Sequence, residues 1–163
     1  MKRFLLLLCL ATLLLTACRQ GERSAEVILE KLMGDCPSLP AGQVYLHSAV
    51  EGMPSYLNGS LRRSLYGEEG EACFPLLSDF AMFLSSRPIP FELAVFLCES
   101  ATDAHRVAAM CMTRADTLRV SLRGSAFEER GEGIRVVVKG RRVIMTVTPD
   151  GDAMERLALR LMG

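Results

Sequence analysis

The chain has 163 residues, half of them hydrophobic, and its 19 basic side chains are balanced by 19 acidic ones. This length suits one domain with a substantial core, and the apolar content argues against a wholly disordered chain. The zero net charge argues against a protein dedicated to nucleic acid, which usually carries a basic excess. We therefore expect a small globular domain without a nucleic-acid partner.

The N-terminus has the pattern of a bacterial lipoprotein signal peptide. Lys2 and Arg3 precede an apolar run over residues 4–15, which is shorter than the roughly 20 residues of a membrane-spanning helix. The run ends in Leu15-Thr16-Ala17-Cys18, which matches a lipobox. We expect cleavage after residue 17 and attachment of lipid to Cys18. The alternatives are a secretory signal with a chance cysteine near its cleavage site, or a cytoplasmic protein with an apolar start.

The expected organisation follows from this signal. Residues 1–17 are the signal peptide, residues 18–23 are the lipidated cysteine and a short polar tether, and residues 24–163 form a single globular domain. Two or three acyl chains hold a protein stably on a bilayer, whereas one chain does not. We expect the domain on the extracytoplasmic face of the bacterial cell membrane, or on the outer membrane in a cell that has one.

The first half of the domain is predicted to be partly irregular. Ser24 is a typical cap for a helix that ends at Gly34. Several prolines and glycines over 35–52 indicate a loop, with a short strand around 44–46. Leucines one turn apart over 57–66 favour a short helix, which the glycine and acidic residues of 67–71 end.

The second half has clearer periodicity. Residues 80–84 and 91–98 favour two strands joined by a proline-containing turn, and Ser100 begins a long helix that runs to about residue 122. Strands over 134–139 and 142–148 are joined by a two-residue turn, and a final amphipathic helix follows. We therefore predict an α+β fold, with an antiparallel sheet of about four strands in ββαββα order, helices on one face and an N-terminal helix before it.

Several short segments together resemble a known bacterial family. After the lipobox come Leu65-Tyr66-Gly67, Asp79-Phe80-Ala81-Met82-Phe83, Glu92-Leu93-Ala94-Val95-Phe96 and a glycine-centred hairpin. These segments are similar to the lipoproteins of the domain-of-unknown-function family numbered 4358, over roughly residues 24–162. The resemblance implies a lipid-anchored extracytoplasmic domain and supplies no catalytic residue.

Four cysteines remain after the signal peptide and Cys18 are set aside. An even number in an exported protein permits two disulfides in three connectivities. Cys36 and Cys73 are the pair we favour, because both lie in loop-like sequence, whereas Cys98 and Cys111 have the positions of small core residues. No C-x-x-C motif is present in the sequence, so a typical oxidoreductase site is not indicated.

Few residues have the spacing of a catalytic or metal site. The two histidines, His47 and His105, stand in no recognisable nucleophile motif. The sequence Met110-Cys111-Met112 cannot converge on one metal ion from a helix, because consecutive side chains diverge by about 100°. We expect no metal and no cofactor.

These observations favour a non-catalytic binding or accessory domain of the cell envelope. It would be held at the membrane by its lipid and bind another envelope protein or a small ligand. Two alternatives stay open: an envelope hydrolase that uses His47 or His105 as base, and a thiol-redox protein that uses Cys36 and Cys73.

Overall fold

The structure is a computed structural model that describes residues 23–36, 38–86 and 88–163. Its helices and strands, in chain order, are α2 (Ala25–Gly34), β1 (Gly42–Leu46), α3 (Gly59–Cys73), the 3-10 turn η1 (Phe74–Leu76), β2 (Leu77–Ser85), β3 (Glu92–Cys98), α4 (Ala101–Leu122), α5 (Glu128–Glu132), β4 (Ile134–Lys139), β5 (Arg142–Val147) and α6 (Gly151–Leu161). Within these described ranges, no helix has both the length and the apolar character needed to cross a membrane.

The five strands form one antiparallel sheet in the order β1-β2-β3-β5-β4. The α+β class, the antiparallel sheet and its two hairpins are confirmed. The fifth strand is β1, which extends the short segment predicted around residues 44–46 and pairs with β2 at one edge. The second hairpin turns at Gly140, whose φ of 60° is the left-handed conformation that a tight turn favours.

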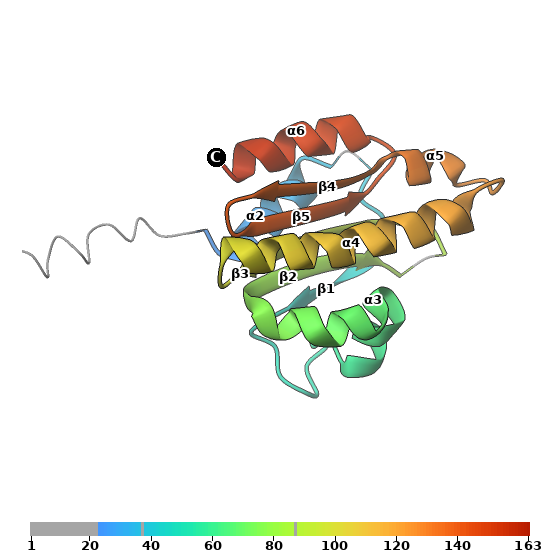
Figure 1. Cartoon of the computed structure of the whole chain (residues 1–163). Coiled ribbons are helices and arrows are strands. Elements are labelled where there is room, and N and C mark those ends of the chain that lie inside the picture. Colours follow the sequence, from blue (N-terminus) through green and yellow to red (C-terminus); the bar gives the residue numbers. More distant parts are fainter. Residues whose placement is uncertain (1–22, 37, 87) are drawn as a thin grey trace, which may run out of the picture.

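Helices cover both faces of the sheet, which corrects the prediction that they cover one. Helices α3 and α4 lie on one face, and α2 and α6 lie on the other (Figure 1). We call these the α3/α4 face and the α2/α6 face. The physical reason is visible in β3, where all seven residues are buried. A strand that is apolar on both sides needs cover on both sides.

Local signals in the sequence set the helix starts. The Ser24 side chain accepts a hydrogen bond from Val27 N–H at the start of α2, as the predicted cap requires. Ser100 Oγ accepts from Asp103 N–H and donates to the Asp103 carboxylate at 2.6 Å, so α4 also begins at its predicted capping residue.

Helix α3 differs from the prediction because it continues past Gly67. This residue has φ 62° and ψ −153°, dihedrals that break the helix into two parts and that only glycine adopts readily. The acidic segment after the break is helical again and ends at Cys73. Gly67 therefore ends the first helical part of α3, and a second helical part follows it directly.

The start of α2 lies beside one end of the sheet. The N–H of Ala25, at the start of α2, donates to the Asp79 carboxylate at 2.8 Å. Asp79 pairs with Leu97 near the end of β3, whereas Glu92 begins that strand. The start of α2 and the β2–β3 turn therefore lie at opposite ends of the domain (Figure 1).

Candidate functional site

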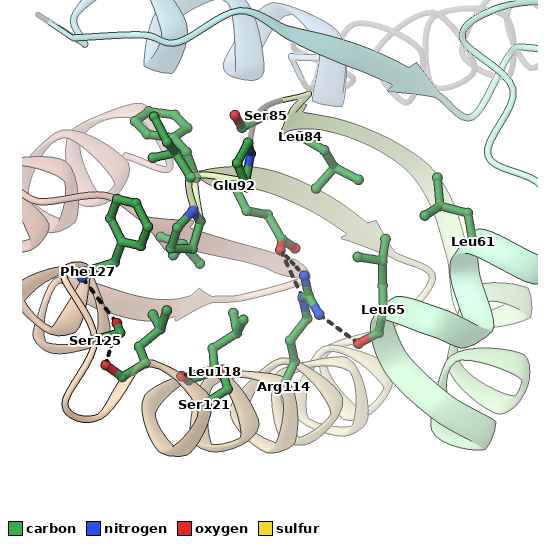
Figure 2. Close-up of a pocket in the computed structure, with 16 residues that line it drawn as sticks. Leu61, Leu65, Leu84, Ser85, Glu92, Arg114, Leu118, Ser121, Ser125 and Phe127 are labelled. Carbon is green, nitrogen blue, oxygen red and sulfur yellow. Dashed lines mark hydrogen bonds and ion pairs between the residues drawn. The ribbon is translucent and has the colours of Figure 1, made fainter.

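A cleft of about 530 Å³ opens on the α3/α4 face, at the end that carries the β2–β3 turn. Its walls come from the first part of α3, from the β2–β3 hairpin, and from the second half of α4 with the loop that follows. Most of the lining side chains are apolar, including Leu61, Leu65, Leu84, Leu118 and Phe127 (Figure 2). This volume and composition are typical of small-molecule sites.

A buried carboxylate, Glu92, lies at the floor of the cleft. Alternation along β3 places Glu92 on the α3/α4 face together with Ala94 and Phe96. The residue is only 2% exposed. A carboxylate at this depth requires partners, because an isolated buried charge is strongly unfavourable.

Arg114 of α4 supplies the main partner. Its Nε donates to Glu92 Oε2 at 2.8 Å, and its Nη2 lies 2.7 Å from the same oxygen. The guanidinium carbon also lies 5.5 Å from the centre of the Tyr66 ring. Burial of Arg114 disfavours its charge, but Glu92, together with Tyr66 and Cys111, outweighs this effect and raises the pKa of the guanidinium. The cleft floor therefore holds a stable ion pair.

Tyr66 of α3 completes the contacts of the carboxylate. Its hydroxyl donates to Glu92 Oε1 at 2.8 Å. Burial, and then the negative charge of Glu92, raise the pKa of Tyr66 well above its ordinary value. The phenol therefore stays protonated and acts as a donor, which excludes it as a general base near neutral pH.

The break at Gly67 provides an acceptor for the same arginine. A helical bond from Glu69 N–H to the Leu65 carbonyl would need helical dihedrals at Gly67, which are absent. The Leu65 carbonyl instead accepts from Arg114 Nη1 at 3.0 Å. Figure 2 shows Arg114 between Glu92 on one side and Leu65 on the other. One guanidinium thus joins α3, β3 and α4.

Two serines at the α4 end of the cleft donate to backbone carbonyls of α4, one from within the helix and one from the loop that follows it. Ser121 Oγ donates to the Leu118 carbonyl at 2.9 Å, and Ser125 Oγ donates to the Leu122 carbonyl at 2.7 Å. Ser125 Oγ also accepts from Phe127 N–H at 3.1 Å, which fixes the loop that carries the Phe127 ring. The wall of the cleft formed by the end of α4 and the following loop is therefore held by local hydrogen bonds.

The cysteines predicted to be functional do not gather at this cleft. Cys18 lies outside the described residues. The expected Cys36–Cys73 disulfide is not formed: both are free thiols, and the sheet separates them, with Cys36 beside the α2/α6 core and Cys73 in the α3/α4 core. Burial raises the pKa of both thiols, so neither is activated as a nucleophile.

The two histidines also lie away from the cleft. His47 is exposed, packs its ring 5.5 Å from that of Phe80, and has its Nδ1 3.9 Å from the carboxylate of Asp79. His105 is exposed in the first turns of α4, whereas the cleft is lined by the other half of that helix. In the part of the chain that the structure describes, no group of three His, Cys, Asp or Glu side chains could hold a metal ion.

The sequence analysis missed Glu92, Arg114 and Tyr66 as site residues. One signal was present: Glu92 is the single charged residue of a strand that is otherwise continuously apolar. A second was the position of Arg114 three residues after Cys111, on the buried stripe of α4. Two opposite charges predicted to face one core are candidates for a buried pair.

Comparison with protein-family models, with curated proteins and with solved structures finds no match for this chain. The resemblance to the family of lipoproteins therefore stays a prediction, and the functional argument rests on the cleft.

Proposed function

We propose that this protein is a lipid-anchored, extracytoplasmic bacterial domain that binds a small apolar molecule without catalysing a reaction. The observation that carries the binding role is an apolar cleft of about 530 Å³ with the buried Glu92–Arg114 ion pair at its floor. Such sites use apolar walls for affinity and a few placed polar groups for orientation. The lipobox that ends at Cys18 supports the location.

The catalytic alternatives have no specific support. Neither His47 nor His105 lines the cleft, and the pKa of Tyr66 is raised rather than poised for proton transfer. The thiol-redox alternative needs Cys36 and Cys73 to react with each other, and the sheet lies between them. We therefore propose one function.

Binding can be tested with N-phenyl-1-naphthylamine, an uncharged dye whose fluorescence rises in apolar surroundings. Leu118→Trp places an indole in the cleft and should weaken dye binding by about tenfold or more. Val120→Trp is the matched control, because Val120 lies on the same helix, is 68% exposed and does not line the cleft. Absence of dye binding, or equal loss in both variants, would refute the binding role.

The proposed anchor is tested separately by the intact mass of the protein extracted from membranes. A chain that begins at Cys18 and carries acyl groups is the expected result, and Cys18→Ser should release the protein from the membrane fraction. A chain that retains residues 1–17 without modification would contradict the anchor and leave the dye experiment unaffected.

A further inference from the structure

We propose that the natural ligand of the cleft is an uncharged acyl compound, whose aliphatic chain lies along the leucine walls and whose amide or ester carbonyl accepts a hydrogen bond from Arg114. This inference rests on the small-molecule function proposed above and adds the chemical class of the ligand. It follows from three features of the cleft: its apolar walls, the balanced charges at its floor and the N–H donors of Arg114 that have no acceptor in the described part of the chain.

The walls favour a chain-like apolar body. Leu61 and Leu65 of α3 lie on one side of the cleft and Leu118 of α4 on the other, with Leu84 of β2 between them and the Phe127 ring at the α5 end (Figure 2). Branched aliphatic side chains bind an alkyl chain by non-directional burial. At about 30 Å³ for each atom, the volume of a liquid water, a space of about 530 Å³ holds roughly 18 non-hydrogen atoms. This is the size of a medium-length acyl chain with a small head group.

The floor is electrically balanced, which favours a head group without charge. The negative Glu92 and the positive Arg114 neutralise each other, and Tyr66 is a protonated phenol. An anionic head group would be repelled by the Glu92 carboxylate, and a cationic one by the guanidinium. Either would also bring an unpaired charge into an apolar site.

The donors that remain at the floor belong to Arg114. A guanidinium has five N–H groups. The Nε–H donates to Glu92, Nη2 is in ion-pair contact with the same carboxylate, and one Nη1 N–H donates to the Leu65 carbonyl. Nη1 and Nη2 therefore keep N–H groups without a hydrogen-bond acceptor among the described residues. The hydroxyls of Ser121 and Ser125 already donate to backbone carbonyls. The complementary group of a ligand is therefore an acceptor, such as the carbonyl oxygen of an amide or an ester.

Three compounds with one tail test this assignment on the unmodified protein. N-methyldecanamide, decanoate and decyltrimethylammonium are each used to displace N-phenyl-1-naphthylamine. We expect the amide to bind at least about tenfold more tightly than either charged compound, a margin equal to one good hydrogen bond. A preference for decanoate or for the cation would overturn the assignment. So would a failure of all three to displace a dye that does bind. Failure of the dye itself to bind would refute the proposed function instead.

The role of Arg114 has its own test. Arg114→Lys keeps a positive charge beside Glu92 but lacks the planar fork of the guanidinium. The preference for the amide over decanoate should fall by about tenfold in this variant. An unchanged preference would show that the carbonyl does not bind Arg114. Because the readout is a ratio between two ligands of one folded sample, partial unfolding of the variant does not imitate it.

Discussion

The two faces of the sheet bury polar groups in different ways. On the α3/α4 face, the Glu92 carboxylate has contacts from both Arg114 and Tyr66. On the α2/α6 face, alternation along β5 places Thr146 beside the apolar side chain Ile144, and the Thr146 hydroxyl has no partner among the described residues. A lone hydroxyl costs about 1–3 kcal/mol and is tolerated, whereas a lone charge is not. The Glu92 carboxylate therefore joins α3 and α4 to β3, whereas the Thr146 hydroxyl joins no described elements.

The largest loss of stability is expected from replacing Arg114, the ion-pair partner of the Glu92 carboxylate. Arg114→Met leaves Glu92 as an uncompensated buried charge and should lower the free energy of unfolding by about 3–5 kcal/mol. Urea denaturation monitored by circular dichroism measures this loss.

The double variant Glu92→Leu with Arg114→Met sharpens the comparison. It removes both charges, and its free energy of unfolding should lie closer to that of the unmodified protein than that of the single variant does. A double variant as unstable as Arg114→Met would show that packing, and not the unpaired charge, causes the loss.

A smaller effect is expected at the helix break that supplies the Leu65 carbonyl. Gly67→Ala should cost about 1–3 kcal/mol, because a side chain is strained at φ 62° although no neighbouring atom would clash with it. Gly34→Ala is the matched control: it also meets no neighbouring atom, and Gly34 has no positive φ. Equal effects of the two substitutions in the same denaturation experiment would contradict the strain at Gly67.

A gain in stability, rather than a loss, is expected from a substitution on the α2/α6 face. Thr146→Val removes a buried hydroxyl that lacks a partner and adds a methyl group of similar size. The free energy of unfolding should rise by about 1 kcal/mol. A loss of stability in thermal unfolding would mean that the hydroxyl has a partner, such as a bound water.

The smallest contribution to stability near neutral pH is expected from the ionisation of the buried Cys98 thiol, and this contribution changes at higher pH. Burial raises the pKa of Cys98 to about 11, from an ordinary value of 9.0. The unfolded chain therefore loses this proton first as the pH rises, so the stability linked to it is complete below about pH 9 and is lost as the pH approaches 11. Cys98→Ala should flatten the decline in stability over this range. An unchanged slope would contradict the raised pKa.

Much of the fold could be predicted because its signals are local. The Ser24 and Ser100 caps, the long apolar stripe of α4 and the turn at Gly140 each depend on a few neighbouring residues. The cover on both faces was missed because the strands predicted over 80–84 and 91–98 were not recognised as apolar on both sides. The continuous burial of β3 shows that both sides are apolar.

Local signals mark Glu92 and Arg114 as candidate residues, but they do not predict which residues of the site contact one another. These contacts join residues far apart in the chain, since Tyr66 and Arg114 lie 26 and 22 positions from Glu92. The disulfide prediction failed for the same reason: loop-like sequence around Cys36 and Cys73 says nothing about which face of a sheet each residue lies on. Such long-range contacts can be predicted only once the topology of the sheet is known.

The opposite placement of the start of α2 and the cleft has a consequence for how a ligand arrives. If Cys18 carries the proposed lipid, the chain between it and Arg23 reaches at most about 18 Å, which would keep the end of the domain that carries Ala25 and Asp79 near the bilayer. The cleft would then lie at the other end of β3, a strand about 20 Å long, and so farther from the bilayer. Under the proposed anchor and ligand, a poorly soluble molecule would not enter the cleft directly from the membrane. It would have to be handed over from the water side, by a soluble carrier or by the opposite membrane surface.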